Sequence, residues 1–241
     1  MNLIRLISKL SLSVLVVVLA LSCGSKQNHT IEVKAQQPVL PVLVGKDDNQ
    51  VLKVELNVPE LPNAVVVEEF EFSLEGTTNI SDFVEATLFY NDEDDFEKAS
   101  VVQKTKDLAE LFSIHGIQPL TEGKQYFWLS VRVNEQPNLT GKIGVKLLNA
   151  TLSGGSQVAV QMEASSQPQR LGIALRQRGQ DNIDTYRIPG MATTNTGTLI
   201  AVYDNRYNDP VDLQEDIDVG MSRSTDGGAT WEPMRGIMDM G

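Results

Sequence analysis

Residues 185–206 read TYRIPGMATTNTGTLIAVYDNR, two runs rich in apolar residues on either side of the polar turn NTGT. The loop YNDPVDLQED, the segment IDVGMSRS and the glycine-rich turn TDGGAT follow in that order, and a further strand is expected from Trp231. Short strands separated by Gly, Asn and Asp turns are typical of antiparallel meanders. Because a four-stranded meander is the unit of a β-propeller, this stretch predicts one blade.

The sequence is too short for a complete propeller. Blades are typically about 40–50 residues long, and about four to eight of them close a ring. From Arg170 to residue 241 there is room for one blade and part of a second. We therefore expect 170–241 to be the start of a propeller domain, and the sequence to be the N-terminal part of a longer protein.

The sequence before the blade also has the pattern of β-strands. Phe70, Phe72 and Leu74 alternate with polar residues in EEFEFSLEG, and QYFWLSVRV at 125–133 alternates in the same way. A period of two indicates strands with one buried face. We predict an antiparallel β-sandwich over 51–165, so that the whole chain is all-β.

Two other segments of this half break the strand pattern. KTKDLAELFSI at 104–114 has a short helical pattern, and EASSQPQ at 163–169 is typical of a domain edge. NDEDD at 91–95 lacks the glycine and the ligand spacing of an EF-hand loop, which favours a solvated turn over a calcium site. Trp128 has two interpretations, an exposed platform that stacks on a sugar ring or a packing residue.

The first 22 residues have the pattern of an export signal. Arg5 and Lys9 precede an apolar run over 10–21, as in the n-region and h-region of signal peptides. The run is shorter than a typical membrane-spanning helix. We predict a signal peptide over 1–22, a tether over 23–50, and export to the periplasm or cell surface of a bacterium.

Cys23 is the only cysteine, and it follows the apolar run directly. This is the place of the lipidated cysteine in a bacterial lipoprotein, although Ala20 stands where that motif prefers leucine. Two interpretations stay open, a lipid anchor on Cys23 and a free thiol left by ordinary signal cleavage. A disulfide within the chain is excluded, because there is no second cysteine.

The net charge of −12 bears on the partners. An acidic surface does not attract DNA, RNA or anionic lipid, so we expect no nucleic acid and no membrane contact beyond a lipid anchor. An acidic ligand would need local arginines to hold it.

SRSTDGGATW at 222–231 resembles the Asp box, a repeated turn of sialidases. Asp226 can accept backbone N–H groups across the turn, Gly227 and Gly228 allow positive φ, and Trp231 can cover the hairpin. We expect a structural role for this turn rather than a calcium or ligand site.

YRIP at 186–189, followed by TTNTGTL at 193–199, resembles the opening of the catalytic domain of bacterial exo-sialidases. The resemblance implies a six-bladed propeller in which Arg187 is one of three arginines that clamp the sialic acid carboxylate. It places Arg206 on the side of the sugar's 4-hydroxyl and makes Asp212 the general acid/base. A guanidinium suits a carboxylate because it binds both oxygens and keeps its charge.

Each of these residues also has a plainer interpretation. Arg187 could be a structural residue paired with Asp184 or Asp204, and Arg206 could lie in a salt bridge at the rim. The loop after Arg206 is rich in acidic residues, and Asp209 is the alternative general acid.

The resemblance implies an exo-α-sialidase that hydrolyses terminal sialic acids of sialylated glycans with retention, without a metal or other cofactor. In that family a tyrosine nucleophile, its glutamate and two further arginines lie late in the chain, so the 241 residues alone are expected to be inactive. The N-terminal half is similar to a module attached to sialidases of Bacteroidetes-type gut bacteria and is a candidate carbohydrate-binding domain. The alternatives are a non-catalytic sialoglycan-binding propeller or adhesin, and a trans-sialidase.

Overall fold

The computed structural model describes residues 30–61, 63–212 and 216–239. The predicted signal peptide over 1–22 and Cys23 lie outside these residues. The described residues form strands joined by turns and three single-turn 3-10 helices (Ile80–Asp82, Phe96–Lys98 and Gln180–Asn182). The predicted all-β class is therefore confirmed.

Twelve strands precede the blade. They are β1 (Glu32–Gln36), β2 (Val42–Val44), β3 (Asn49–Val58), β4 (Val65–Ser73), β5 (Phe83–Asn91), β6 (Ser100–Thr105), β7 (Leu111–Leu120), β8 (Gly123–Val133), β9 (Lys142–Ile143), β10 (Lys146–Leu152), β11 (Ser156–Met162) and β12 (Gln169–Ile173).

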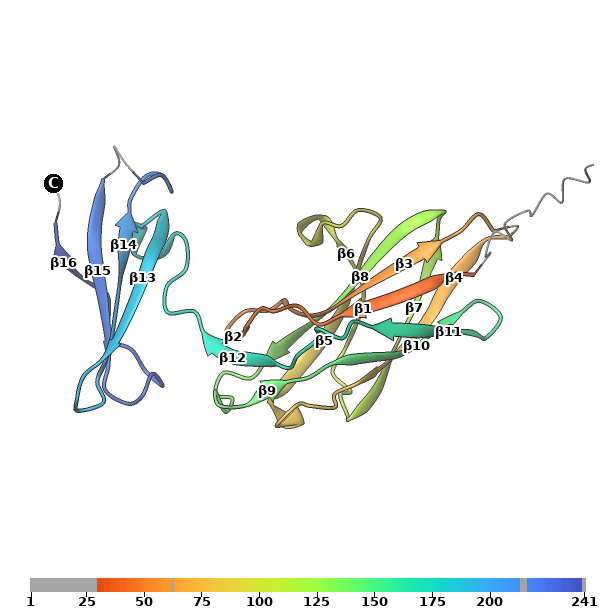
Figure 1. Cartoon of the computed structure of the whole chain (residues 1–241), viewed down its shortest axis with the longest axis horizontal. Coiled ribbons are helices and arrows are strands. Elements are labelled where there is room, and N and C mark those ends of the chain that lie inside the picture. The colour runs from red at the N-terminus through yellow and green to blue at the C-terminus, as the bar shows by residue number, and fades with distance from the viewer. Residues whose placement is uncertain (1–29, 62, 213–215, 240–241) are drawn as a thin grey trace, which may run out of the picture.

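Nine of these strands form one sheet in the order β6-β5-β8-β3-β1-β11-β10-β4-β7. All neighbours in it are antiparallel except β1 and β11, which are parallel. The sheet curls until its edge strands β6 and β7 approach: a Cβ on Gly116 of β7 would lie 2.8 Å from Val102 of β6. The two layers expected of a sandwich are thus two halves of one nearly closed barrel, seen in Figure 1.

The barrel is filled by the alternating residues that the sequence places on one face. Phe70, Phe72 and Phe127 are fully buried, and the ring of Phe127 meets that of Phe70 edge-on at 5.0 Å. Strands β2, β12 and β9 form a separate three-stranded sheet at the end of the barrel from which the chain leaves.

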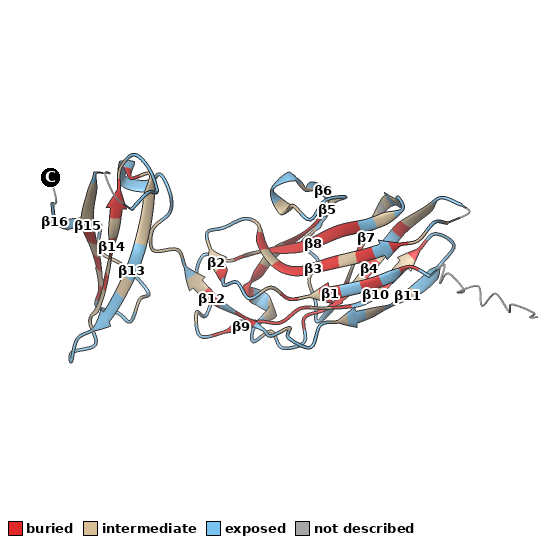
Figure 2. Cartoon of the chain, turned by 45° about the horizontal axis from the view of Figure 1, so that its top comes forward, coloured by how far each residue is buried: buried red, intermediate tan, exposed pale blue. Residues whose placement is uncertain are grey.

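The blade is the antiparallel meander β13 (Thr185–Thr193), β14 (Leu199–Arg206), β15 (Ile217–Ser224) and β16 (Arg235–Met238). Figure 1 shows these blue strands as a separate body, joined to the barrel by the segment after β12. The predicted four-stranded meander is confirmed. In Figure 2 the buried segments run along many barrel strands, but within the blade they lie mainly on β14 and β15.

Several expectations about the elements are wrong. The predicted helix over 104–114 is instead the end of β6, a loop and the start of β7, because Leu111 and Phe112 pair with β4. The predicted tether over 23–50 contains β1, β2 and the start of β3. The last strand of the blade starts at Arg235 rather than at Trp231, and β12 pairs with β2 and β9 rather than with the blade.

Trp128 is not an exposed platform. Its side chain is 2% exposed and packs with Phe89, Tyr126 and Phe96 in a second cluster on the outer face of the sheet. The ring of Phe96, from the single-turn helix after β5, lies edge-on to it at 5.8 Å. Of the two interpretations of Trp128, the packing role is the one the structure shows.

Candidate active site on the blade

A β-bulge interrupts the first strand of the blade directly after Arg187. Arg187 pairs with Asp204 of β14, yet the next pair is Gly190 with Val202. Two residues of β13 thus stand opposite one residue of β14, which defines a bulge. Ile188 in this bulge has φ of +50°, a region in which β-branched residues are genuine outliers.

The bulge decides which face of the sheet Arg187 occupies. Directly opposite residues of an antiparallel pair share a face, so Arg187 lies on the face of Asp204 and Arg206, and Tyr186 on the face of Asn205. If β13 alternated regularly back from Gly190, the extra residue would carry Arg187 to the other face. The strain at Ile188 therefore accompanies the placement of Arg187 on the face of Arg206.

Arg187, Arg206 and Asp212 form one charged cluster at the end of β14. Asp212 Oδ1 lies 2.6 Å from Arg206 Nη2 and 3.3 Å from Arg187 Nη1. Both arginines also donate to the carbonyl oxygen of Pro210 at 2.7 Å. The structure thus brings the three residues named from the sequence together.

Arg206 holds the loop that carries Asp212. Its side chain is 2% exposed, and Nη1 donates to the carbonyl oxygens of Pro210 and Val211. Its Nη2 lies 3.0 Å from Asp204 and also meets Asp212. Both of its terminal nitrogens are engaged by the protein, so the side chain fixes the loop in addition to any contact it makes with a ligand.

Asp212 is held in its charged form. The hydrogen bond from Arg206, followed by the charges of Arg187 and Arg206, lowers the pKa of this carboxyl below its ordinary value. A general acid must be protonated when it acts. In this arrangement Asp212 therefore matches the deprotonated, base form of an acid/base residue.

The alternative partners named for Arg187 are engaged elsewhere. Asp184 accepts a hydrogen bond from Arg178 at 2.8 Å, and Asp204 pairs with Arg206. Asp209, the alternative acid, accepts the backbone N–H of Val211 at 2.9 Å and so shapes the loop.

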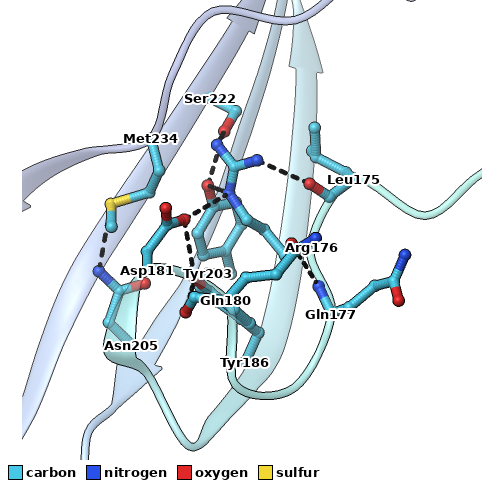
Figure 3. A network of polar contacts seen from close by, with 10 residues as sticks. All are labelled: Leu175, Arg176, Gln177, Gln180, Asp181, Tyr186, Tyr203, Asn205, Ser222 and Met234. Atoms are coloured by element: carbon cyan, nitrogen blue, oxygen red, sulfur yellow. Dashed lines mark hydrogen bonds and ion pairs between the residues drawn. The ribbon is translucent and has the colours of Figure 1, made fainter.

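The opposite face of the blade carries a polar network that the sequence analysis did not find. As Figure 3 shows, Arg176 reaches onto this face from the segment between β12 and β13. Its Nε donates to the hydroxyl of Tyr203 at 2.9 Å and its Nη2 to Ser222 at 2.6 Å. Tyr203 can lie across β15 because Gly220 faces it: a Cβ there would approach the Tyr203 ring to 2.7 Å.

No sequence signal marks Arg176, because its partners are brought to it only by the pairing of β14 with β15. The network contains the hydroxyl of Tyr186, which lies 3.0 Å from the carbonyl oxygen of Gln180 and 3.1 Å from Asp181 and can donate its one proton to either. Burial and the bond to Asp181 raise the pKa of Tyr186. Arg176 therefore ties the segment before β13 to the blade.

The Asp-box turn is closed by its own side chains. Asp226 accepts the backbone N–H of Thr230 at 3.0 Å and the hydroxyl of Ser224 at 2.7 Å. The indole of Trp231 donates to the carbonyl of Gly228 at 3.1 Å. The hydroxyl of Thr230 also donates to Asp226, and this bond, followed by those from the Thr230 backbone and Ser224, lowers the pKa of Asp226.

Within residues 30–61, 63–212 and 216–239, no helix is both long and apolar enough to cross a bilayer. Across the same residues, no three or more His, Cys, Asp or Glu side chains gather as they would around a metal ion.

Three comparisons bear on the family. The N-terminal domain of BNR-repeat neuraminidase matches residues 30–156. A sialidase of Bacteroides fragilis (strain YCH46) is 46% identical over 122 residues, which are 51% of this chain and 22% of that protein. An anhydrosialidase of Macrobdella decora is 44% identical over 46 residues, 19% of this chain and 6% of that protein.

Among solved structures, the Hadza microbial sialidase Hz136 superposes with a TM-score of 0.74 at 30% identity, over 85% of this chain and 44% of that one. The chain thus spans about a fifth of the length of the Bacteroides relative and less than half of the solved sialidase. With the matched domain covering more than half of its residues, the chain belongs to the BNR-repeat neuraminidase family.

Proposed function

We propose that the complete protein is an exo-α-sialidase that hydrolyses terminal sialic acids of sialylated glycans with retention. The observation that supports this most directly is the pairing of Arg187 and Asp212 at the end of β14. Cleavage of an acidic sugar requires two groups near the scissile bond. A cation binds the carboxylate of the sugar, and a carboxyl group protonates the leaving oxygen.

In this proposal Arg187 binds the carboxylate of the sugar. Its guanidinium is 41% exposed, which leaves it open to a ligand, and its backbone is fixed by pairing with Asp204. Arg206 orients the loop and borders the hydroxyl side of the sugar. Two further arginines, the tyrosine nucleophile and its glutamate would come from the later part of the propeller.

Asp212 is proposed to protonate the glycosidic oxygen and then to deprotonate the incoming water. Since the anomeric carbon of sialic acid carries a carboxylate, a neutral tyrosine nucleophile avoids the repulsion that an attacking carboxylate would meet. The proton on Asp212 must be acquired after the sugar binds, because the free carboxyl is held charged by the two arginines.

The test is carried out on the complete protein with two substrates. Asp212→Asn should reduce kcat on sialyl-lactose by about 10²-fold or more, and much less on an aryl sialoside, whose phenolate leaves without protonation. Asp209→Asn is the matched control, since Asn keeps the oxygen that accepts from Val211. Equal losses on both substrates would give Asp212 a structural role. If wild type forms neither sialic acid, nor its anhydro form, nor a new sialoside, the enzyme is excluded in favour of a binding propeller.

The identity of the product is the second point to measure. The Macrobdella decora relative is named an anhydrosialidase, which favours intramolecular transfer as the alternative to hydrolysis. Mass spectrometry of the product from sialyl-lactose separates the two, because free sialic acid is one water heavier than its anhydro form. A new sialoside formed with added lactose would instead indicate a trans-sialidase.

We also propose that the protein is exported and anchored through a lipid on Cys23. Metabolic labelling with a fatty acid should mark the wild type and not Cys23→Ser. Export without labelling would favour ordinary signal cleavage.

A further inference from the structure

The carboxylate subsite at Arg187 already holds an anion that belongs to the protein. Asp212 Oδ1 lies 3.3 Å from Arg187 Nη1, and the same guanidinium nitrogen donates to the carbonyl oxygen of Pro210 at 2.7 Å. A ligand carboxylate that takes Arg187 must therefore compete with a carboxylate supplied by the chain.

The two ion pairs of Asp212 differ in how open they are. Arg187 is 41% exposed and Asp212 is 65% exposed, whereas Arg206 is 2% exposed. A ligand can therefore reach the ion pair between Asp212 and Arg187. The shorter ion pair with Arg206, at 2.6 Å, involves a buried guanidinium that a ligand cannot reach as easily. Asp212 can give up Arg187 without losing the partner that holds it in the site.

We infer that Asp212 is an internal occupant of the carboxylate subsite, so that an anionic sugar binds by displacing it from Arg187 and shifts Asp212 towards its protonated form. The inference rests on the proposed function and adds a role in ligand selection to the acid/base role. A neutral sugar has no charge with which to replace Asp212, so this exchange favours anionic ligands.

The charges around Asp212 determine whether ligand binding raises or lowers its pKa. Arg187 faces it from β13 and Arg206 from β14; Asp204 pairs with the same Nη2 of Arg206, and Asp209 lies earlier in the same loop. When a ligand carboxylate occupies Arg187, Asp212 loses one cation and gains a neighbouring anion. Both changes favour its neutral form, so its pKa is higher in the complex than in the free protein.

Because the pKa rises on binding, the complex takes up a proton at a pH between the free and bound values. The affinity of wild type for the carboxylate should therefore increase as the pH falls from 7 towards 5. A sialic acid carboxylate remains ionised throughout this range, so the change reports on the protein.

The experiment is calorimetric titration of the complete protein with N-acetylneuraminate. At pH 7 Asp212→Asn should bind about threefold to tenfold more tightly than wild type, since an exposed, solvent-screened competitor has been neutralised, while it turns over sialyl-lactose more slowly. The affinity of Asp212→Asn for N-acetylneuraminate should also be independent of pH between 7 and 5. Asp184→Asn, which removes a carboxylate paired with Arg178 on the same blade, should bind as wild type does.

Two further measurements keep the inference open to refutation. The methyl ester of N-acetylneuraminate, which has no charge, should show no gain on Asp212→Asn. Wild type titrated in buffers of different ionisation enthalpy should show net proton uptake, and this needs no variant to fold. Unchanged or weaker binding by a folded Asp212→Asn, or the absence of proton uptake by wild type, overturns the inference. If wild type releases no sialic acid from sialyl-lactose, the proposed function is overturned instead.

Discussion

The barrel and the blade bury different kinds of side chain. The main core cluster runs from Ile31 to Leu171 and lies entirely outside the blade. Among the described residues of the blade and the turn before it, the buried apolar ones are Ile183, Ala201 and Tyr203, beside four buried polar ones, Asn205, Arg206, Ser222 and Ser224. The barrel thus closes around its own apolar interior, whereas the blade buries mainly polar side chains, of which Arg206 belongs to the candidate site.

The largest difference between the two regions is expected in the free energy of unfolding, when a side chain of the barrel core is truncated. Phe127→Ala should lower the free energy of unfolding by about 3–5 kcal/mol, because its fully buried ring packs against Phe70 and Tyr90. Urea unfolding followed by circular dichroism measures the change. The matched blade variant, Met191→Ala, removes a side chain that is 66% exposed and should cost less than about 0.5 kcal/mol. Equal costs would mean that the blade is packed as tightly as the barrel.

A smaller effect should appear in the blade alone as the pH falls. The pKa of Asp226 is lower in the folded turn than its ordinary value of 3.8, so its contribution to stability is present above 3.8 and is lost as the pH falls towards the folded value. Thermal unfolding between pH 6 and pH 2.5 should show a fall in blade stability that Asp226→Asn lacks. The same slope in both proteins would show that other carboxyls govern acid unfolding.

The smallest effect is expected at the bulge. Ile188 is 62% exposed, at φ of +50°, where asparagine is tolerated far better than a β-branched residue. Ile188→Asn should raise the free energy of unfolding by about 1 kcal/mol without changing the KM of the complete protein. Ile188→Val, which keeps the β-branch, is the control and should be near neutral. A loss of stability in Ile188→Asn would show that packing of the isoleucine outweighs its backbone strain.

Much of the fold is visible in the sequence because alternation is a local property. The period-two pattern of Phe70 and Phe72 predicts a strand with a buried face, and both residues are buried. The helical pattern over 104–114 fails because Leu111 and Phe112 are drawn into β7 by pairing with β4. The parallel pair of β1 and β11 joins segments more than a hundred residues apart, which no local pattern encodes.

For the candidate site, the sequence named Arg187, Arg206 and Asp212 through their resemblance to a family motif. The roles of these residues in binding the substrate and in catalysis stay predictions. Local patterns could not show that Arg206 is covered and clamps the loop, since this depends on the carbonyl groups of Pro210 and Val211. Nor could they place the bulge, because Pro189 is compatible with an edge strand as well as with a bulge, and only the pairing of β13 with β14 decides between them.

Because of the bulge, the face on which Arg187 lies depends on the number of residues between Arg187 and Gly190 as well as on their identity. With one of the two bulge residues removed, the ladder between β13 and β14 becomes regular and Arg187 still stands opposite Asp204. With both removed, the alternation carries its guanidinium to the face of Tyr203. Deletion of one bulge residue should therefore be far better tolerated during evolution than deletion of both, and an alignment of relatives that slips by one position would misassign the arginine.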